Sequence, residues 1–382
     1  MSKMSNERRA KYEALNREIG IVEHGFVPSQ TTEGDDSDRA DDDGPQTDPV
    51  IEFLNHAMSQ GYKMETGCFL QHPGYFQAPH KRSFDDVDIV MLGCPFDMGG
   101  VGSARGSRHG PRAVREWSRR HGPVHDSTRR IPYAQCRICD YGDVEWSANE
   151  VDACVNDIYN LIMEIGKSGA TPLVCGGDHT ITFPILKALS QTLDDEPIGV
   201  IHLDAHNDSM GPLGTDTYHD GMIFRKGVVD GIIDPERTLQ IGIRGRLTHV
   251  GGLDFSEASG MTVITADEVW EQGTSRIVDR CKEIIGQGPA YLSLDVDCID
   301  STEMMGTGGP TTFGLTGRQV RDIIMGVNEL NFVGADLVEL APGLDPTQGS
   351  SHLAAGLFFE LLSLLADTRV RMNGETGPTT WI

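Results

Sequence analysis

The chain has 382 residues, of which 38% are hydrophobic and 23% are charged, a composition typical of a globular protein with a large core. Its formal net charge of −25 argues against nucleic acid and anionic membranes as partners, because both would repel the chain. No apolar run is long enough to cross a bilayer, and the charged N-terminus lacks an apolar signal-peptide core, so a cytoplasmic location is expected.

The N-terminal part differs from the rest of the chain. Residues 1–49 combine a short charged helix candidate with an acidic stretch that has few apolar residues to bury, so a disordered linker is expected there. Residues 50–85 contain several aromatic side chains and are expected to form an irregular extension that covers a neighbouring subunit or the mouth of a site. A single α/β domain is predicted over residues 86–382.

From residue 87 onwards, apolar segments of strand length alternate with segments of helical period. The strand candidates are 87–93, 171–176, 198–204, 238–244, 261–266, 290–295 and 332–340. Strands that are apolar throughout predict a mostly parallel sheet covered by helices on both faces, a three-layer α/β/α fold. The sequence has no glycine-rich phosphate loop at a strand–helix junction, so no nucleotide cofactor is predicted.

Cysteine usage points to reduced, structural thiols. Cys94, Cys175 and Cys298 lie in apolar runs and are interpreted as buried thiols. Cys136 and Cys139 form a single CxxC, which is interpreted as the edge of a packed hairpin because a zinc site usually needs a second pair.

Polar residues with metal-binding side chains follow three of the predicted strands. His179 follows the strand at 171–176, and Asp295 and Asp297 follow the strand at 290–295. The third strand runs into Asp204, His206 and Asp208, and alternate residues of an extended segment point the same way. Six such ligands exceed the needs of one tetrahedral ion, and four aspartates in one pocket repel each other unless cations neutralise them. The pattern therefore predicts two divalent ions that share bridging carboxylates.

These segments resemble the metal motifs of the ureohydrolases, the arginase and agmatinase family. The three motifs are GGDH (176–179), DAHND (204–208) and SLDVDCID (293–300), and lesser matches extend from about residue 87 to 365. The resemblance, closest to agmatinases, implies an arginase-like fold in a trimer or hexamer. It assigns one ion to His179, Asp204, Asp208 and Asp295, and the other to His206, Asp204, Asp295 and Asp297.

The resemblance also implies roles in breaking a carbon–nitrogen bond. Water activated by the two ions would attack the carbon of a guanidinium group. Asp297 would orient this water and pass its proton to the leaving nitrogen. Glu339 matches the family's glutamate that pairs with the guanidinium, since a carboxylate accepts two parallel N–H bonds.

Two segments depart from the agmatinase pattern. In the segment HDGMIFR, Asp220 stands where a histidine is usual and His219 lies one position earlier. Either His219 serves as a proton shuttle, or Asp220 contacts a cationic substrate, or neither has a role. In the loop at 306–314, Thr311 replaces an acidic residue and Phe313 replaces a glycine, so we expect the Phe313 ring to shrink or cap the pocket, beside Met304 and Met305.

The departures resemble the family branch that acts on guanidine or dimethylbiguanide (metformin), which implies nickel as the metal. The carboxylate-rich ligand set suits manganese and the two imidazoles permit nickel. The favoured prediction is a hydrolase of a small cationic guanidino compound that works as a homo-oligomer. One alternative is an agmatinase or guanidino-acid hydrolase, in which Arg105, Arg108 and His109 would hold a carboxylate, although GPRAVR is interpreted first as a helix start. The other alternative is a non-catalytic subunit in an oligomer with a homologous second subunit.

Overall fold

The computed structural model describes residues 74–100, 105–146, 150–210, 218–245, 247 and 250–374. The predicted segment 1–49 and most of the extension at 50–85 lie outside these residues. Within the described part of the chain, no helix is both long and apolar enough to span a membrane.

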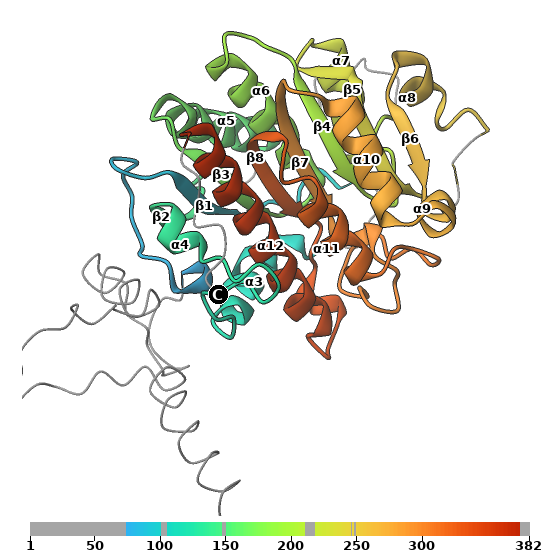
Figure 1. Cartoon of the computed structure of the whole chain (residues 1–382). Helices are drawn as coiled ribbons and strands as arrows, with labels where there is room; N and C mark the ends of the chain where they lie inside the picture. The colour runs from blue at the N-terminus through green and yellow to red at the C-terminus, as the bar shows by residue number, and fades with distance from the viewer. Residues whose placement is uncertain are drawn as a thin grey trace, which may run out of the picture. The chain divides into compact units, whose positions relative to one another are not determined.

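Eight strands form one sheet, and every neighbouring pair is parallel. The order across the sheet is β2-β1-β3-β8-β7-β4-β5-β6 (Figure 1). The bounds are β1 Ile89–Cys94, β2 Ile138–Asp143, β3 Thr171–Gly176, β4 Ile198–Leu203, β5 Ile233–Ile243, β6 Thr262–Thr265, β7 Pro289–Asp295 and β8 Asn331–Val338.

All seven predicted strands are present, and β1, β3, β4, β7 and β8 are buried along most of their length, as strands covered on both faces are. Strand β6 lies at an edge of the sheet and is only partly buried. The eighth, β2, was not predicted, since its sequence ICDYGD is half polar. It is an edge strand that pairs in parallel with β1, so interpreting Cys139 as part of a hairpin is wrong. The seven cysteines of the described residues, including Cys94, Cys175 and Cys298, are all buried free thiols.

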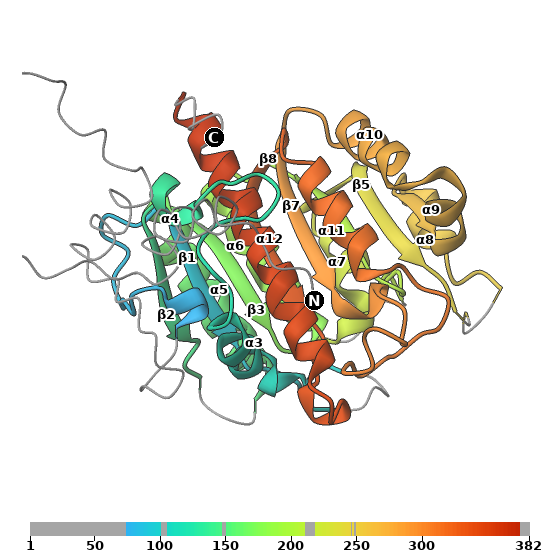
Figure 2. The same cartoon turned by 60° about the horizontal axis from the view of Figure 1, so that its bottom comes forward.

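Helices cover both faces of the sheet and confirm the three-layer prediction. Helices α3, α10, α11 and α12 lie on one face, and α5, α6 and α7 lie on the other (Figures 1 and 2). The bounds are α3 Gly110–Ser118, α4 Pro132–Gln135, α5 Val151–Lys167, α6 Thr182–Thr192, α7 Ile223–Val229, α8 Asp254–Ser259, α9 Ala266–Gln272, α10 Thr274–Ile285, α11 Gly317–Gly326 and α12 Gly349–Met372.

The strand order brings the predicted site together. Strands β3, β8, β7 and β4 are consecutive neighbours at the centre of the sheet. Their carboxyl ends lie at one edge, and residues His179, Glu339, Asp295 and Asp204 stand at or just after these four ends. In open parallel sheets this edge is where ligands bind.

Candidate metal centre

His179 stands among three carboxylates. Its Nδ1 atom lies 3.2 Å from Asp204 Oδ2, 3.1 Å from Asp208 Oδ2 and 3.3 Å from Asp295 Oδ2. The chain reaches this position through Gly177, where a side chain would collide with the carbonyl oxygen of Phe96. These four residues are the set that the sequence assigned to one ion.

A second cluster adjoins the first. His206 Nδ1 lies 3.0 Å from Asp297 Oδ2 and 3.4 Å from Asp204 Oδ1. The other oxygen of Asp297 accepts a hydrogen bond from the backbone N–H of Ala205 at 3.0 Å, which fixes the carboxylate. Gly309 closes over the cluster, and a Cβ atom there would lie 3.2 Å from both Asp297 Oδ2 and the His206 ring. Asp204 therefore joins the two clusters, as a bridging ligand would.

The donor set fits divalent cations. His179 Nδ1 is buried and makes no hydrogen bond, although it faces three carboxylates. Burial and the charge of Asp204 raise the pKa of Asp208 to about 7, and burial and Asp297 raise the pKa of Asp295 well above its usual range. Buried carboxylates crowded around one imidazole need positive charge, which two divalent ions would supply.

The two clusters open into a cavity of about 820 Å³. The described residues of its wall carry six carboxylates and two guanidinium groups. The carboxylates belong to Asp208, Asp220, Asp254, Asp295, Asp297 and Glu339, and the guanidinium groups to Arg225 and Arg244. The excess of negative charge favours a cationic ligand.

The two arginines of the wall already have partners. The Arg244 side chain donates to six backbone carbonyls: those of Gly242, Asp297, Cys298, Ile299, Thr311 and Thr312. It thereby ties the loop after β7 to the end of β5. The Arg225 guanidinium lies over the Phe255 ring, 4.4 Å from its centroid.

Glu339 lies at the end of β8, between the ends of β3 and β7. Its backbone adopts a left-handed conformation with φ of 65°. One carboxylate oxygen accepts the backbone N–H of His179 at 2.8 Å, and the side chain lines the cavity. Burial, followed by the charge of Asp295, raises the pKa of Glu339 well above its usual range. An arriving cation would relieve this unfavourable burial of charge.

The two candidate residues of the HDGMIFR segment, His219 and Asp220, differ in their position relative to the cavity. Asp220 lines the cavity, whereas His219 does not. His219 Nδ1 is buried and has no hydrogen-bond partner among the residues that the structure describes, and burial lowers the pKa of this imidazole. The geometry therefore favours Asp220 over His219 as a group that meets a ligand.

The expectation that Phe313 caps the cavity is wrong for this chain. Phe313 is 82% exposed, has a φ of 62°, and is not among the residues that line the cavity. Thr311 is also outside the wall, where its hydroxyl donates to the Gly309 carbonyl. Met304 is fully buried in the core and Met305 is half exposed, so neither adds apolar surface to the site.

The arginine-rich segment before α3 is structural. Arg108 pairs with the carboxylate of Asp97, and Pro111 stands in the first turn of α3. Arg115 bonds to Asp140 and Asp143 on the edge strand β2. None of these residues lines the cavity, which confirms the interpretation of GPRAVR as a helix start.

The sequence analysis did not identify two polar residues that contact the predicted ligands from within the strands of the sheet. His202 on β4 lies 2.7 Å from Asp204 Oδ2, and Ser293 on β7 lies 2.9 Å from the second nitrogen of His179. Both had been included in apolar strands without a role. The available signal was their position, since each stands two residues before a predicted ligand on the same strand.

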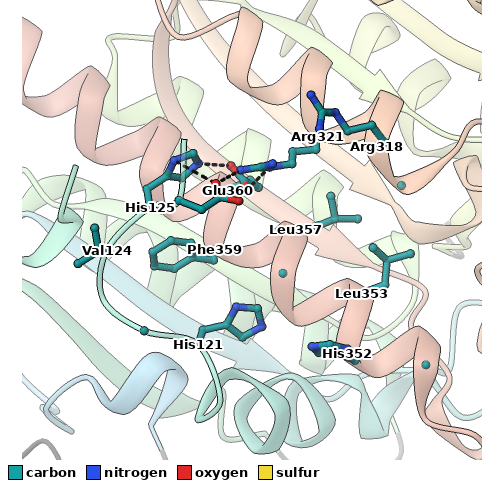
Figure 3. A pocket seen from close by; sticks show the side chains of 15 residues that line it. His121, Val124, His125, Arg318, Arg321, His352, Leu353, Leu357, Phe359 and Glu360 are labelled. Carbon is teal, nitrogen blue, oxygen red and sulfur yellow. Dashed lines mark hydrogen bonds and ion pairs between the residues drawn. The ribbon is translucent and has the colours of Figure 1, made fainter. Parts of the chain in front are cut away.

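A second cavity of about 470 Å³ lies elsewhere, between the loop at 121–126 and helices α11 and α12 (Figure 3). His125, Glu360 and Arg321 form a bonded network at one side of it, and His121 lies near His352 at the other. It includes none of the predicted site residues.

Comparisons with known proteins agree with this geometry. The model of the Arginase family matches residues 87–363. The chain is 34% identical over 300 residues to a guanidinopropionase of Pseudomonas aeruginosa, covering 78% of this chain and 93% of that protein. It is 36% identical over 288 residues to the human mitochondrial guanidino acid hydrolase, covering 75% of this chain and 81% of the relative.

A solved structure is similar as well. The proclavaminate amidino hydrolase from Streptomyces clavuligerus superimposes with a TM-score of 0.75 at 32% identity, covering 79% of this chain and 100% of that chain. This likeness confirms the predicted arginase-like α/β fold. The chain belongs to the arginase family: it is a ureohydrolase, an enzyme that hydrolyses carbon–nitrogen bonds in linear amidines.

Proposed function

We propose that this ureohydrolase binds two divalent ions and hydrolyses a small cationic guanidino compound, with guanidine and dimethylbiguanide as the favoured substrates. The observation that carries the proposal is the convergence of six ligand side chains at the ends of three central strands, β3, β7 and β4, beside one acidic cavity. The predicted products are urea or guanylurea, with ammonia or an amine.

The ligands would divide into two sets that share two aspartates. His179 and Asp208 belong to one set, His206 and Asp297 to the other, and Asp204 and Asp295 to both. When bound, such an ion pair would lower the pKa of water and supply a nucleophile at neutral pH. The carboxylate-rich set suits manganese, and the two imidazoles permit nickel.

Asp297 and Glu339 would carry out the remaining chemistry. Asp297 is held through one oxygen by the Ala205 N–H, so its other oxygen is fixed toward the His206 side of the cavity. From there it would orient the attacking water and deliver a proton to the leaving nitrogen. Glu339 would accept N–H bonds from the guanidinium and hold its carbon over the ligands.

The rest of the wall supports a cationic or neutral far end of the substrate. Asp220 and Asp254 add negative charge beyond the ligands. Arg244 already donates to backbone carbonyls, so among the described residues of the wall it is Arg225 that has N–H groups to offer a carboxylate. A guanidino acid would therefore meet more repulsion than attraction here.

Hydrolysis of a guanidino acid is the second candidate. Arg225 in the wall favours it, and so do the relatives, whose names include a guanidinopropionase and a guanidinobutyrase of Pseudomonas aeruginosa. Agmatine is a third substrate to compare, because its second cation would suit Asp220. A supporting role without catalysis is disfavoured by the complete ligand set. The trimeric or hexameric state and the cytoplasmic location remain part of the proposal.

A substrate panel tests these candidates. The metal-free protein is loaded separately with Mn²⁺ and Ni²⁺, then assayed for urea, guanylurea and ammonia with guanidine, dimethylbiguanide, agmatine, 3-guanidinopropionate and 4-guanidinobutyrate. We expect the highest kcat/KM for guanidine or dimethylbiguanide. A preference for a guanidino acid that is lost in Arg225→Ala would establish the second candidate. A protein that holds two ions yet hydrolyses none of these compounds would refute the proposal.

A further inference from the structure

Four buried polar residues form a row across the centre of the sheet. Asp336 on β8 pairs with Ser293 on β7, Ser293 pairs with His202 on β4, and His202 pairs with Gln240 on β5. All four side chains are fully buried. Since alternate residues of a strand point to the same face, this polar row lies in the layer directly beneath the ligands Asp295 and Asp204.

One half of the polar row ends on His179. The Ser293 hydroxyl donates to Asp336 Oδ1 at 2.7 Å, and Ser293 Oγ lies 2.9 Å from His179 Nε2. The other oxygen of Asp336 accepts from the hydroxyls of Tyr291 and Thr182 at 2.8 and 2.7 Å. Because the Ser293 proton is committed to Asp336, Ser293 must accept the Nε2 proton of His179. In the neutral imidazole that binds a metal, Nδ1 then carries the lone pair, on the side of the ring that faces the three carboxylates of the site.

The other half ends on Asp204. Gln240 Nε2 lies 3.3 Å from His202 Nδ1 and also donates to the Asn207 carbonyl at 2.6 Å. An amide nitrogen only donates, so His202 Nδ1 accepts and the ring proton stands on Nε2. This proton points at Asp204 Oδ2, 2.7 Å away. The His202 ring is held flat against Phe224 of α7, with centroids 3.9 Å apart.

On the opposite face of the same strands, the corresponding row of side chains is apolar. There, Leu203 pairs with Leu294, and Leu294 pairs with Leu337. A buried polar row is more costly to assemble than such an apolar one, because each group must recover the hydrogen bonds that it loses with water. The polar row recovers part of this cost through its contacts with two residues of the site, His179 and Asp204.

We propose that Asp336, Ser293, His202 and Gln240 are positioning residues of the metal centre. They fix the tautomer of His179 and the orientation of the Asp204 carboxylate, so that both ligands present lone pairs to the cations. Groups that hold a ligating histidine in this way typically contribute about 10- to 100-fold to metal affinity. The inference rests on the proposed binuclear site.

Metal titration of matched variants tests the inference. Ser293→Ala removes the acceptor of the His179 proton, whereas Tyr291→Phe, on the same strand, removes a donor to the same Asp336 without touching His179. For Ser293→Ala we expect a roughly 10- to 100-fold weaker affinity for one of the two ions, measured by chelator competition and by metal content after dialysis. For Tyr291→Phe we expect less than a threefold change. His202→Phe keeps a ring against Phe224 but removes the bond to Asp204, and should also weaken metal binding.

Thermal unfolding of the metal-free forms separates positioning from simple stability. If Ser293→Ala and Tyr291→Phe lower Tm similarly but only Ser293→Ala loses metal affinity, the inference stands. It is overturned if Ser293→Ala retains both ions with wild-type affinity, or if Tyr291→Phe loses as much. The titration needs no substrate, so a wild-type protein that binds two ions and hydrolyses nothing would refute the proposed function alone.

Discussion

Replacing Glu339 by glutamine tests how the substrate is held. The side chain keeps its size and its acceptor for the His179 N–H, but it loses the charge that faces the cavity. A hydrogen bond to a charged group contributes about 1.5–3 kcal/mol. Because about 1.4 kcal/mol corresponds to a factor of ten, we expect kcat/KM for a guanidinium substrate to fall roughly 10- to 150-fold.

The assay is steady-state hydrolysis by the metal-loaded protein, with metal content measured in parallel. Glu339→Gln should retain both ions, since Glu339 belongs to neither ligand set. The matched control is Glu303→Gln, whose carboxylate bonds to the Gly317 N–H away from the cavity and should leave kcat/KM nearly unchanged. Unchanged kcat/KM in Glu339→Gln would refute the assignment of the guanidinium to this carboxylate.

Three further changes have expected outcomes. Phe313→Ala should alter kcat/KM by less than twofold, because the ring is 82% exposed and outside the cavity wall; a larger loss in the same assay would mean that it meets the substrate. Removing the metal with a chelator should lower Tm in a calorimetric scan, because an ion present at 100 times its Kd stabilises the folded protein by about 2.7 kcal/mol. An unchanged Tm would argue against metal binding by the folded protein. Burial opposes ionisation of Asp300, but bonds from Thr302 and Gly314 lower its pKa from 3.8 to about 2. Its stabilising effect is therefore complete above pH 4 and lost as the pH falls through 2, so the difference in urea-unfolding free energy between wild type and Asp300→Asn should shrink from pH 5 to pH 3. A constant difference would refute this.

The strands and the ligands could be predicted from the sequence because the ligand residues stand at or just beyond the ends of apolar runs of strand length. Apolar runs such as 198–203 identify a strand buried on both faces, and a run that ends in DAHND identifies its ligand-bearing end. Strand β2 could not be found in this way. An edge strand needs only one partner and tolerates Asp140 and Asp143, whose charges are compensated by Arg115 from α3.

The position of Phe313 could not be predicted either, for a different reason. Aligning a loop residue with a family position says nothing about the direction of its side chain. Here Arg244 fixes carbonyls of the loop, Asp300 accepts the Gly314 N–H, and Phe313 stands between them at a positive φ with its side chain exposed. These bonds join residues far apart in the sequence, so a local pattern does not contain them.

The position of the ligands and the pairing register of the central strands depend on each other. In β7, Ser293 and Asp295 point to one face of the sheet and Leu294 points to the other. In β4 and the residue that follows it, His202 and Asp204 point to the first face and Leu203 points to the second. A shift of one residue would place the polar row against the apolar helices α10 to α12 and expose leucines to the ligand layer. The row of Leu203, Leu294 and Leu337 therefore favours the register that places the ligands at the site. The polar row makes the shifted register less stable, because its polar groups would then be buried against apolar helices. The alternation of faces along these strands thus also helps to bring three carboxylates within reach of the His179 imidazole.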